Sequence, residues 1–171
     1  MLCAAILPLV MAAEIGPMAA GVPARVPQFA VDGNTVALVF GSKQSIYFSS
    51  STDAGKTFSE PVRVAESPVL PLTRHRGPRV VFSSGAIVVT AVVGTMASAG
   101  EHSHGLPSDG DLKAWRSEDR GRTWSKGVSV NDVTGASSEG LHSLAADAKG
   151  NLFAVAWYAK PFGSTHERSA K

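Results

Sequence analysis

The sequence predicts an all-β protein assembled from a repeated four-stranded unit. Three observations lead to this prediction. First, short runs of β-branched and aromatic residues alternate with Gly-, Asp-, Asn- and Ser-rich turns from Gln28 to Tyr158. Second, the pattern Ser-x-Asp-x-Gly-x-Thr-aromatic occurs twice, at residues 51–58 and 117–124. Third, the strands around both copies follow the same order, which indicates an internal repeat.

Each copy of the pattern predicts a tight turn that is closed by its own side chains. Ser and Asp side chains bond to turn backbone groups, and Gly adopts a positive φ without steric cost. We therefore expect Asp53 and Asp119 to be structural and to accept hydrogen bonds from amides of their own turns. The aromatic residues Phe58 and Trp124 should anchor the following strand and be largely buried.

The first unit contains four short strands in about forty residues, which is the content of one β-propeller blade. The turn at residues 32–34 separates the first two strands. A second turn at 41–43 precedes the strand that leads into the first copy of the pattern, which we call the first box. The expected strands cover residues 29–31, 35–40, 45–49 and 62–64.

The second unit repeats this order. The apolar run 86–93 is rich in Val and Ile, which favours a buried inner strand over a helix. A segment without periodicity, residues 94–110, interrupts the unit before its third strand. The expected strands cover residues 79–82, 86–93, 112–116 and 128–130.

A third unit begins near Leu141 and has two expected strands, at residues 144–146 and 152–158. After Lys160 no third strand and no third box follow, and residues 161–171 are polar and irregular. The sequence thus predicts two four-stranded blades and half of another, within residues 28–160. Open blade edges of this kind favour self-association.

Composition excludes several classes of function. A formal charge of +2 without a run of Lys or Arg argues against nucleic acid binding. The only cysteine, Cys3, leaves no disulfide framework and no thiolate zinc site. The cluster of residues 101–104, Glu-His-Ser-His, is too small for a metal site, and no cofactor-binding motif occurs. We expect neither a metal nor a cofactor.

The N-terminal segment is apolar from Met1 to Ala13 and too short to span a bilayer comfortably. Its small residues at 10–13 resemble the end of a secretory signal, although the basic start is missing. We interpret residues 1–22 as a signal or apolar N-terminal segment, and expect a secreted or periplasmic protein without a membrane span.

The box pattern resembles the Asp-box, or BNR repeat, of the sialidase-like β-propellers. Three further stretches resemble bacterial exported proteins that are labelled exo-α-sialidases: Arg-Gly-Pro-Arg (76–79), Gly-Asp-Leu-x-Ala-Trp-Arg-Ser (110–117) and Glu-Gly-Leu-His (139–142). The resemblance implies part of a six-bladed-type propeller. It also implies recognition or hydrolysis of terminal sialic acid, or a similar acidic sugar, in the full-length relative.

The resemblance also implies site residues. Sialidases use a tyrosine nucleophile rather than two carboxylates, and an arginine in an Arg-Ile-Pro stretch grips the substrate carboxylate. The arginine of that stretch corresponds to Arg76 in this sequence, and Arg79 is the second choice for the same role. The acid/base aspartate is expected in the loop before the second box, where Asp109 is the first choice and Asp111 the second. The stretch 139–142 precedes the third unit at a position that matches Arg76 in the second, so we expect Glu139 and His142 to line the same pocket.

This chain departs from the sialidase pattern at several positions. Gly77 replaces the isoleucine, and Gly94 stands with Thr95 where many sialidases carry an arginine. The nucleophile and the other arginines belong to later blades, while Tyr47 and Tyr158 lie within strands and look like packing residues. The catalytic set is therefore incomplete, and we expect this chain to be inactive alone.

Several alternatives stay open. The function could be that of a non-catalytic carbohydrate- or protein-binding propeller, or the chain could be a fragment without independent function. At the residue level, Arg76 could be a solvated loop arginine, Asp109 an Asp-Gly turn residue and Glu139 a cap. If the propeller geometry holds, Arg76, Asp109 and Glu139 should gather at one end of the blades, opposite both boxes, with Arg76 close to Asp109.

Overall fold

The computed structural model describes residues 23–99 and 105–158. The predicted signal segment 1–22, the Glu-His-Ser-His cluster at 101–104 and the irregular tail 161–171 lie outside the described residues. Every regular element in the described ranges is a strand. The ten strands are β1 (Arg25–Asp32), β2 (Thr35–Ser42), β3 (Ser45–Ser51), β4 (Val62–Glu66), β5 (Arg79–Ser83), β6 (Ala86–Val93), β7 (Asp111–Ser117), β8 (Val128–Ser129), β9 (His142–Ala146) and β10 (Leu152–Ala156).

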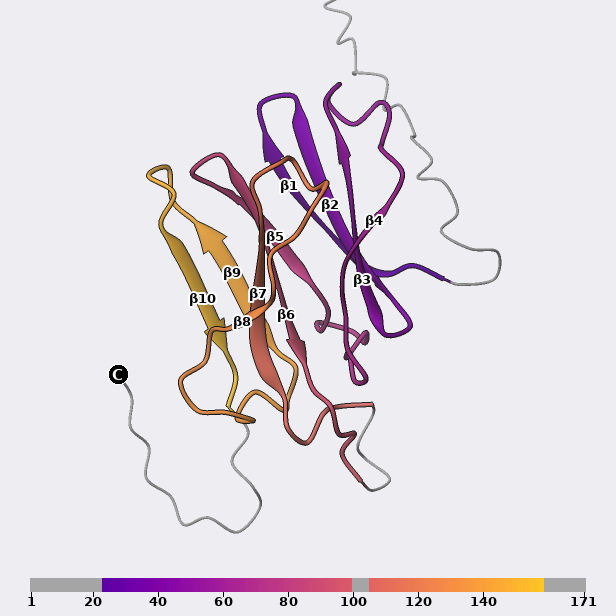
Figure 1. Ribbon diagram of the computed structural model, residues 1–171, viewed down its shortest axis with the longest axis vertical. Coiled ribbons are helices and arrows are strands. Elements are labelled where there is room, and N and C mark those ends of the chain that lie inside the picture. The colour runs from indigo at the N-terminus through magenta and orange to yellow at the C-terminus, as the bar shows by residue number, and fades with distance from the viewer. Residues whose placement is uncertain (1–22, 100–104, 159–171) are drawn as a thin grey trace, which may run out of the picture.

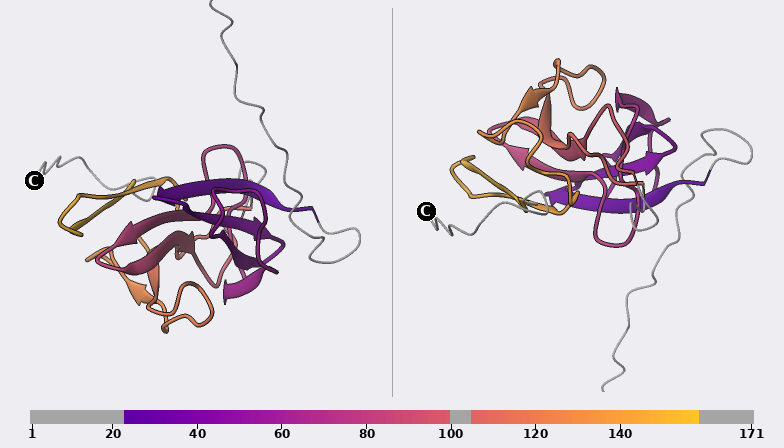
Figure 2. Two further views of the ribbon diagram at one scale, coloured as in Figure 1. Left: turned by 90° about the horizontal axis from the view of Figure 1, so that it is seen from above. Right: turned by 90° about the horizontal axis from the view of Figure 1, so that it is seen from below.

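The strands form three antiparallel sheets in chain order. The first contains β1-β2-β3-β4, the second β5-β6-β7-β8, and the third is the hairpin β9-β10. The first strands of the units lie side by side, β1 next to β5 and β5 next to β9. Figures 1 and 2 show the three sheets in succession, from indigo β1 to the yellow β10 at the far side. The fold is the predicted partial propeller of two blades and half of a third.

The main core lies between the first two blades. The first blade contributes Phe48 and three smaller residues of β2 and β3, and the second contributes Trp115 and the alternate residues of β6. The remaining residues of β6 are buried as well, so the whole apolar run 86–93 is buried on both faces. The buried core residues are Ala37, Val39, Ile46, Phe48, Val64, Leu70, Val80, Ile87, Val89, Ala91, Val93 and Trp115.

The first box has the predicted side-chain closure. The Asp53 carboxylate accepts hydrogen bonds from the Thr57 amide (2.9 Å) and hydroxyl (2.7 Å), and the Ser51 hydroxyl donates to it at 2.7 Å. The Gly55 amide donates to Ser51 Oγ at 2.8 Å, with Gly55 at a φ of 86°. These bonds hold the pKa of Asp53 well below its usual range, the Ser51 hydroxyl being the largest cause.

The second box repeats these contacts. Asp119 accepts from the Thr123 amide (2.9 Å), the Thr123 hydroxyl (2.6 Å) and the Ser117 hydroxyl (2.9 Å). Hydrogen bonds from Thr123, above all, lower the pKa of Asp119 to about 2. The prediction for both aspartates is confirmed. The prediction for the aromatics is also confirmed, because Phe58 and Trp124 are of intermediate exposure and most of each residue is covered. Trp124 also packs against the core between the first two blades.

No helix in the described ranges is long and apolar enough to cross a membrane.

Candidate functional site

The strand ladder divides the molecule into two ends. Arg79 of β5 pairs with Thr90 of β6, and Thr90 pairs with Ala114 of β7, so β5 and β7 run in the same direction. The residues that precede β5 and β7, Arg76 and Asp109 among them, therefore lie at the same end, which we call the front end. The two boxes follow β3 and β7 and lie at the other end, the box end. In Figure 1 the box end is at the top.

The first residues of the three units occupy equivalent positions. In each unit the last residue of the first strand pairs with the first residue of the second strand. These pairs are Asp32–Thr35, Ser83–Ala86 and Ala146–Leu152. Aligned from these hairpins, the stretches at 25–28, 76–79 and 139–142 coincide. They read Arg-Val-Pro-Gln, Arg-Gly-Pro-Arg and Glu-Gly-Leu-His.

The second residue of each stretch has a positive φ: 52° for Val26, 121° for Gly77 and 70° for Gly140. Neighbouring units meet at these residues. A Cβ added to Gly77 would lie 2.9 Å from Val26 Cβ, and one added to Gly140 would lie 3.1 Å from Arg76 Cδ. Successive units thus pack closely here, and a β-branched residue with positive φ, as at Val26, is an uncommon conformation.

Arg76 is held by the third unit. Its Nε donates to the Glu139 backbone oxygen at 2.6 Å, and Nη2 lies 3.6 Å from Glu139 Oε2. Nη1 makes a long bond to Thr73 Oγ1, 3.4 Å. The Arg76 side chain is 21% exposed and that of Glu139 42% exposed. The structure thus joins two of the predicted site residues, Arg76 and Glu139, across the boundary between the second and third units.

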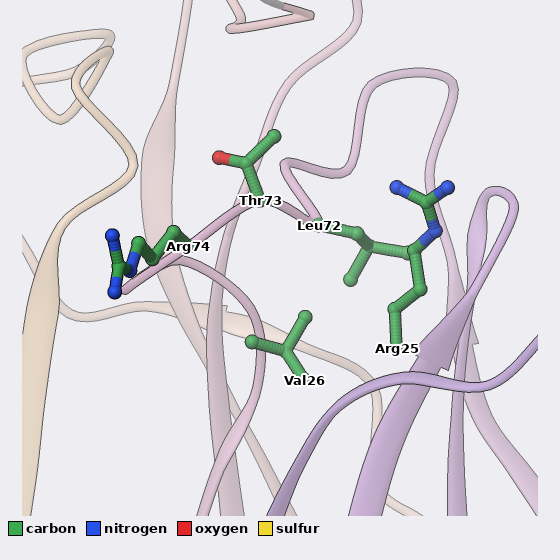
Figure 3. A pocket seen from close by; sticks show the side chains of 5 residues that line it. All are labelled: Arg25, Val26, Leu72, Thr73 and Arg74. Carbon is green, nitrogen blue, oxygen red and sulfur yellow. The ribbon is translucent and has the colours of Figure 1, made fainter.

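A hollow of about 470 Å³ lies beside Arg76 at the front end. Figure 3 shows Arg25 and Arg74 on opposite sides of it, with the guanidinium of Arg74 turned away from Arg25, and with Thr73, Leu72 and Val26 between them. Two guanidinium groups around an apolar floor with one hydroxyl suit a ligand that carries an anionic group. Among the described residues, neither arginine forms an ion pair.

Arg79, the second-choice arginine, is partly buried and bonds only to backbone. Its Nη1 donates to Pro78 O at 3.2 Å and its Nη2 to His75 O at 3.1 Å. Burial lowers the pKa of this guanidinium. The described residues place no carboxylate within ion-pair distance of Arg79.

His142 lies against the second blade. Its Nε2 is 3.1 Å from the hydroxyl of Thr90, which is 1% exposed, and its Nδ1 is buried without a partner among the described residues. Burial, and then the charge of Arg79, lower the pKa of His142 to about 4. The imidazole is therefore neutral near pH 7 and serves as a hydrogen-bonding group rather than a cation.

Asp109 caps the loop that follows β6. The amides of Thr95 and Met96 donate to its carboxylate at 3.0 Å, and the Thr95 hydroxyl makes a further, very short bond. The Thr95 hydroxyl is the main cause that lowers the pKa of Asp109. A general acid needs a raised pKa instead, so these contacts are those of the turn alternative. The catalytic role of Asp109 stays a prediction.

Asp111, the second choice, is bound to the loop after the second blade. Its Oδ1 accepts from Asn131 Nδ2 at 2.8 Å and from the Gly135 amide at 2.6 Å. The same loop pairs with Gly110, because the Ser137 amide donates to Gly110 O at 2.8 Å. The loop then continues to Glu139, and so connects the Asp109–Asp111 region with Arg76 at the front end.

The packing around Gly94 explains why this chain has no arginine there, as many sialidases do. A side chain at Gly94 would overlap Pro107 and the carboxylate of Asp109. The loop from residue 94 to 110 packs so closely on its own start that an arginine does not fit at residue 94 in this conformation.

Sequence reasoning missed Arg25 and Arg74. For Arg25 the signal was present, because Arg25-Val26-Pro27 has the same Arg-x-Pro form as Arg76-Gly77-Pro78 and begins the preceding unit. For Arg74 no repeat gives a signal, since its role depends on the fold of the loop before β5. Within the described residues there is no cluster of three or more His, Cys, Asp or Glu that could hold a metal ion.

No family model and no curated protein sequence matches this chain. Solved structures do resemble it. BlXynB, a GH43 protein from Bacillus licheniformis, matches 84% of this chain with a TM-score of 0.50 at 16% identity. A Hadza microbial sialidase matches 63% of the chain (20% identity, TM-score 0.46), and the endo-arabinase from Bacteroides thetaiotaomicron matches 75% (18% identity, TM-score 0.44).

The likeness to BlXynB concerns the fold. This chain spans 28% of the length of BlXynB, and 26% and 43% of the sialidase and the endo-arabinase. The arrangement of sheets in this chain is thus shared with part of a larger protein.

Proposed function

We propose that the front end of this propeller segment binds the anionic group of an acidic sugar, with terminal sialic acid as the first candidate. The observation that carries the proposal is the hollow between Arg25 and Arg74, beside Arg76. A guanidinium matches a carboxylate in shape and charge, and two such groups on opposite walls favour an anion over a neutral ligand. The names of the similar structures, a sialidase among them, agree with a glycan-related function.

Arg76 adds to this cationic surface but is shared with Glu139. Its Nε is occupied by the Glu139 backbone, while its charge is only partly offset by a carboxylate at 3.6 Å. A ligand carboxylate in the hollow would therefore meet Arg25 and Arg74 first. Arg76 would contribute at longer range.

In a full-length relative the proposed activity is hydrolysis of the bound acidic sugar, and the residues of this chain correspond to part of its substrate-binding set. A second candidate is glycan binding without catalysis. The hydrogen bonds that occupy both oxygens of Asp109 favour this second candidate for the chain by itself. Export to the cell exterior or periplasm fits both candidates and belongs to the proposal.

The test is a titration of the ¹⁵N-labelled chain with the methyl α-glycoside of N-acetylneuraminic acid, with methyl glucuronide, and with methyl galactoside as the neutral comparison. We expect the acidic sugars to shift the amide signals of Thr73, Arg74 and Gly77 at roughly millimolar concentration. The affinity should fall with added salt, because charge attraction is screened.

Arg25→Gln and Arg74→Gln should each weaken this binding severalfold. Arg63→Gln is the matched control, since Arg63 lies on the outer strand β4 with a 60% exposed side chain. If all three variants bind equally, or if the shifts occur at the box end, the proposed acidic-sugar site is wrong. A response to glucuronide but not to the sialoside would move the proposal to uronic acids.

A further inference from the structure

A second hollow lies at the box end, on the face opposite the proposed acidic-sugar site. It has a volume of about 580 Å³ and is bounded by the ends of strands from all three units. We call it the box-end cleft. The turn between β9 and β10 forms one wall and is fixed in place, because Ser83 Oγ donates to Gly150 O at 2.7 Å. Gly150 is so close to Ser84 that no side chain would fit there.

The hydroxyl groups of this cleft are uncommitted. Ser50, Thr52 and Ser84 line it, and none of their hydroxyls takes part in a hydrogen bond within the described part of the chain. The neighbouring hydroxyls of Ser51 and Ser117 behave differently, because the boxes use both. Donors and acceptors that face one volume without internal partners are free to bond to a ligand.

Charged groups of both signs surround these hydroxyls. Asp32, Arg120 and Lys149 line the cleft and have no ion-pair partner within the described residues. Asp147 also lines it, but its carboxylate is bonded to the amides of Lys149 and Asn151 in its own turn. Two positive and two negative charges cancel, so the cleft does not select for an ion.

The floor of the cleft is apolar. Ile87 is 4% exposed there, and Phe82 packs against the core while it keeps part of its ring accessible. A cavity of this size with an apolar floor and a few convergent polar groups has the usual character of a small-molecule site. A sugar ring matches it, since the ring has an apolar C–H face and a rim of hydroxyls that both donate and accept hydrogen bonds.

We propose that the box-end cleft binds neutral sugar units of a glycan. Asp32 accepts hydrogen bonds from sugar hydroxyls, Arg120 and Lys149 donate to sugar oxygens, and Phe82 packs against the ring. The site is independent of the front end, because the two share no lining residue.

The experiment is a titration of the ¹⁵N-labelled full chain with xylotriose and with cellotriose. Amide signals of Ser84, Gly85 and Lys149 should move and saturate at millimolar sugar, whereas those of Thr73 and Arg74 should stay in place. Asp32→Asn and Arg120→Gln should each weaken the affinity about fivefold or more, since each replaces a charged hydrogen-bonding group with a neutral one that bonds more weakly.

Two controls keep the outcome clear. Arg116→Gln removes an exposed arginine of the same blade that does not line the cleft, and Glu60→Gln removes an exposed carboxylate of the first blade. Both should bind as the original chain does, as should Arg25→Gln. The proposal is overturned if neither sugar shifts the cleft amides, or if Asp32→Asn and Arg120→Gln bind as well as the controls. If Arg25→Gln abolishes sialoside binding but not the binding of the neutral sugars, the acidic-sugar site and the box-end cleft are two separate sites.

Discussion

Gly121 in the second box packs directly against the ring of Phe48 in the first blade. A Cβ at residue 121 would overlap three carbons of that ring, which is 1% exposed. Trp124 of the same box meets Phe48 edge-on, with ring centroids 5.2 Å apart. The second box therefore does more than close a turn, because it also docks its blade on the preceding one.

This contact predicts different costs for the same substitution in the two boxes. Gly55 and Gly121 share a φ of 86°, so Ala at either position carries the strain of left-handed backbone, about 1–2 kcal/mol. The Cβ at Gly55 would meet only Val36, at 3.9 Å. At Gly121 the overlap with Phe48 adds about 1–3 kcal/mol of overpacking. Chemical denaturation of Gly121→Ala and Gly55→Ala should show this order, and equal losses would contradict the docking role.

The box aspartate offers a second test of stability. Asp119→Asn removes the charge that accepts the bonds from Thr123 and Ser117, so the melting temperature should fall by a few degrees. Glu118→Gln is the control in the same turn. Its side chain is 79% exposed and pairs only with Arg116, so its loss should change the melting temperature little. An unchanged melting temperature for Asp119→Asn would contradict the structural role.

The pKa of His142 predicts a pH dependence of stability. The unfolded chain binds a proton on this imidazole near its ordinary value of 6.5, whereas the folded chain binds it only near 4. Between these values the unfolded state holds more protons, so the free energy of unfolding falls as the pH is lowered through this window. The loss should be roughly 1–3 kcal/mol and complete near pH 4.

His142→Gln tests this origin, because Gln does not titrate and can still bond to Thr90. The variant should lack the loss between pH 6.5 and 4, measured by urea denaturation at a series of pH values. A loss of the same size in His142→Gln would assign the effect to another group. Asp119, with a pKa of about 2, acts in a separate window, since its contribution is lost only as the pH falls from about 3.8 to 2.

Most of the fold could be predicted from the sequence because its signals are local. All ten strands were expected, and their hairpins follow from turns such as 32–34 and 83–85, where Gly or Asn accompanies alternating apolar residues. The boxes could be predicted for the same reason, since every bond to Asp53 or Asp119 comes from within its own turn. The contact of Trp124 with Phe48 could not, because it joins two different blades.

The candidate site was less predictable because its contacts join different units. Nothing local to Arg76 indicates that its Nε bonds to the backbone of Glu139, 63 residues later in the chain. Asp109 looked like a free loop aspartate, yet it caps Thr95 at the other end of a long loop. The exception is the equivalence of Glu139 with Arg76, which the repeat predicted and the strand pairing confirms.

The purified chain should show no turnover of a fluorogenic sialoside. The reason lies in Asp109, whose carboxylate is held in the ionised form by Thr95 and Met96 and is poorly suited to donate a proton. The described tyrosines are also engaged, Tyr47 in a stack with Phe40 and Tyr158 in a bond to Asp132. Turnover that disappears in Asp109→Asn but persists in Asp132→Asn would contradict this and restore the catalytic role.

The last prediction concerns the charge of Glu139, which stands where the first two units carry arginine. Glu139→Gln keeps the backbone oxygen that accepts the bond from Arg76 Nε but removes the carboxylate 3.6 Å from Nη2. An acidic sugar then no longer competes with Glu139 for Arg76, and the affinity should rise about two- to fivefold, most clearly at low salt. The matched control is Glu66→Gln, which breaks the 2.9 Å pair with Arg63 on the outer strand β4 and should leave the affinity unchanged. A fall in affinity for Glu139→Gln, with the control unaffected, would mean instead that the carboxylate holds Arg76 in the orientation that the ligand needs, or contacts the sugar itself.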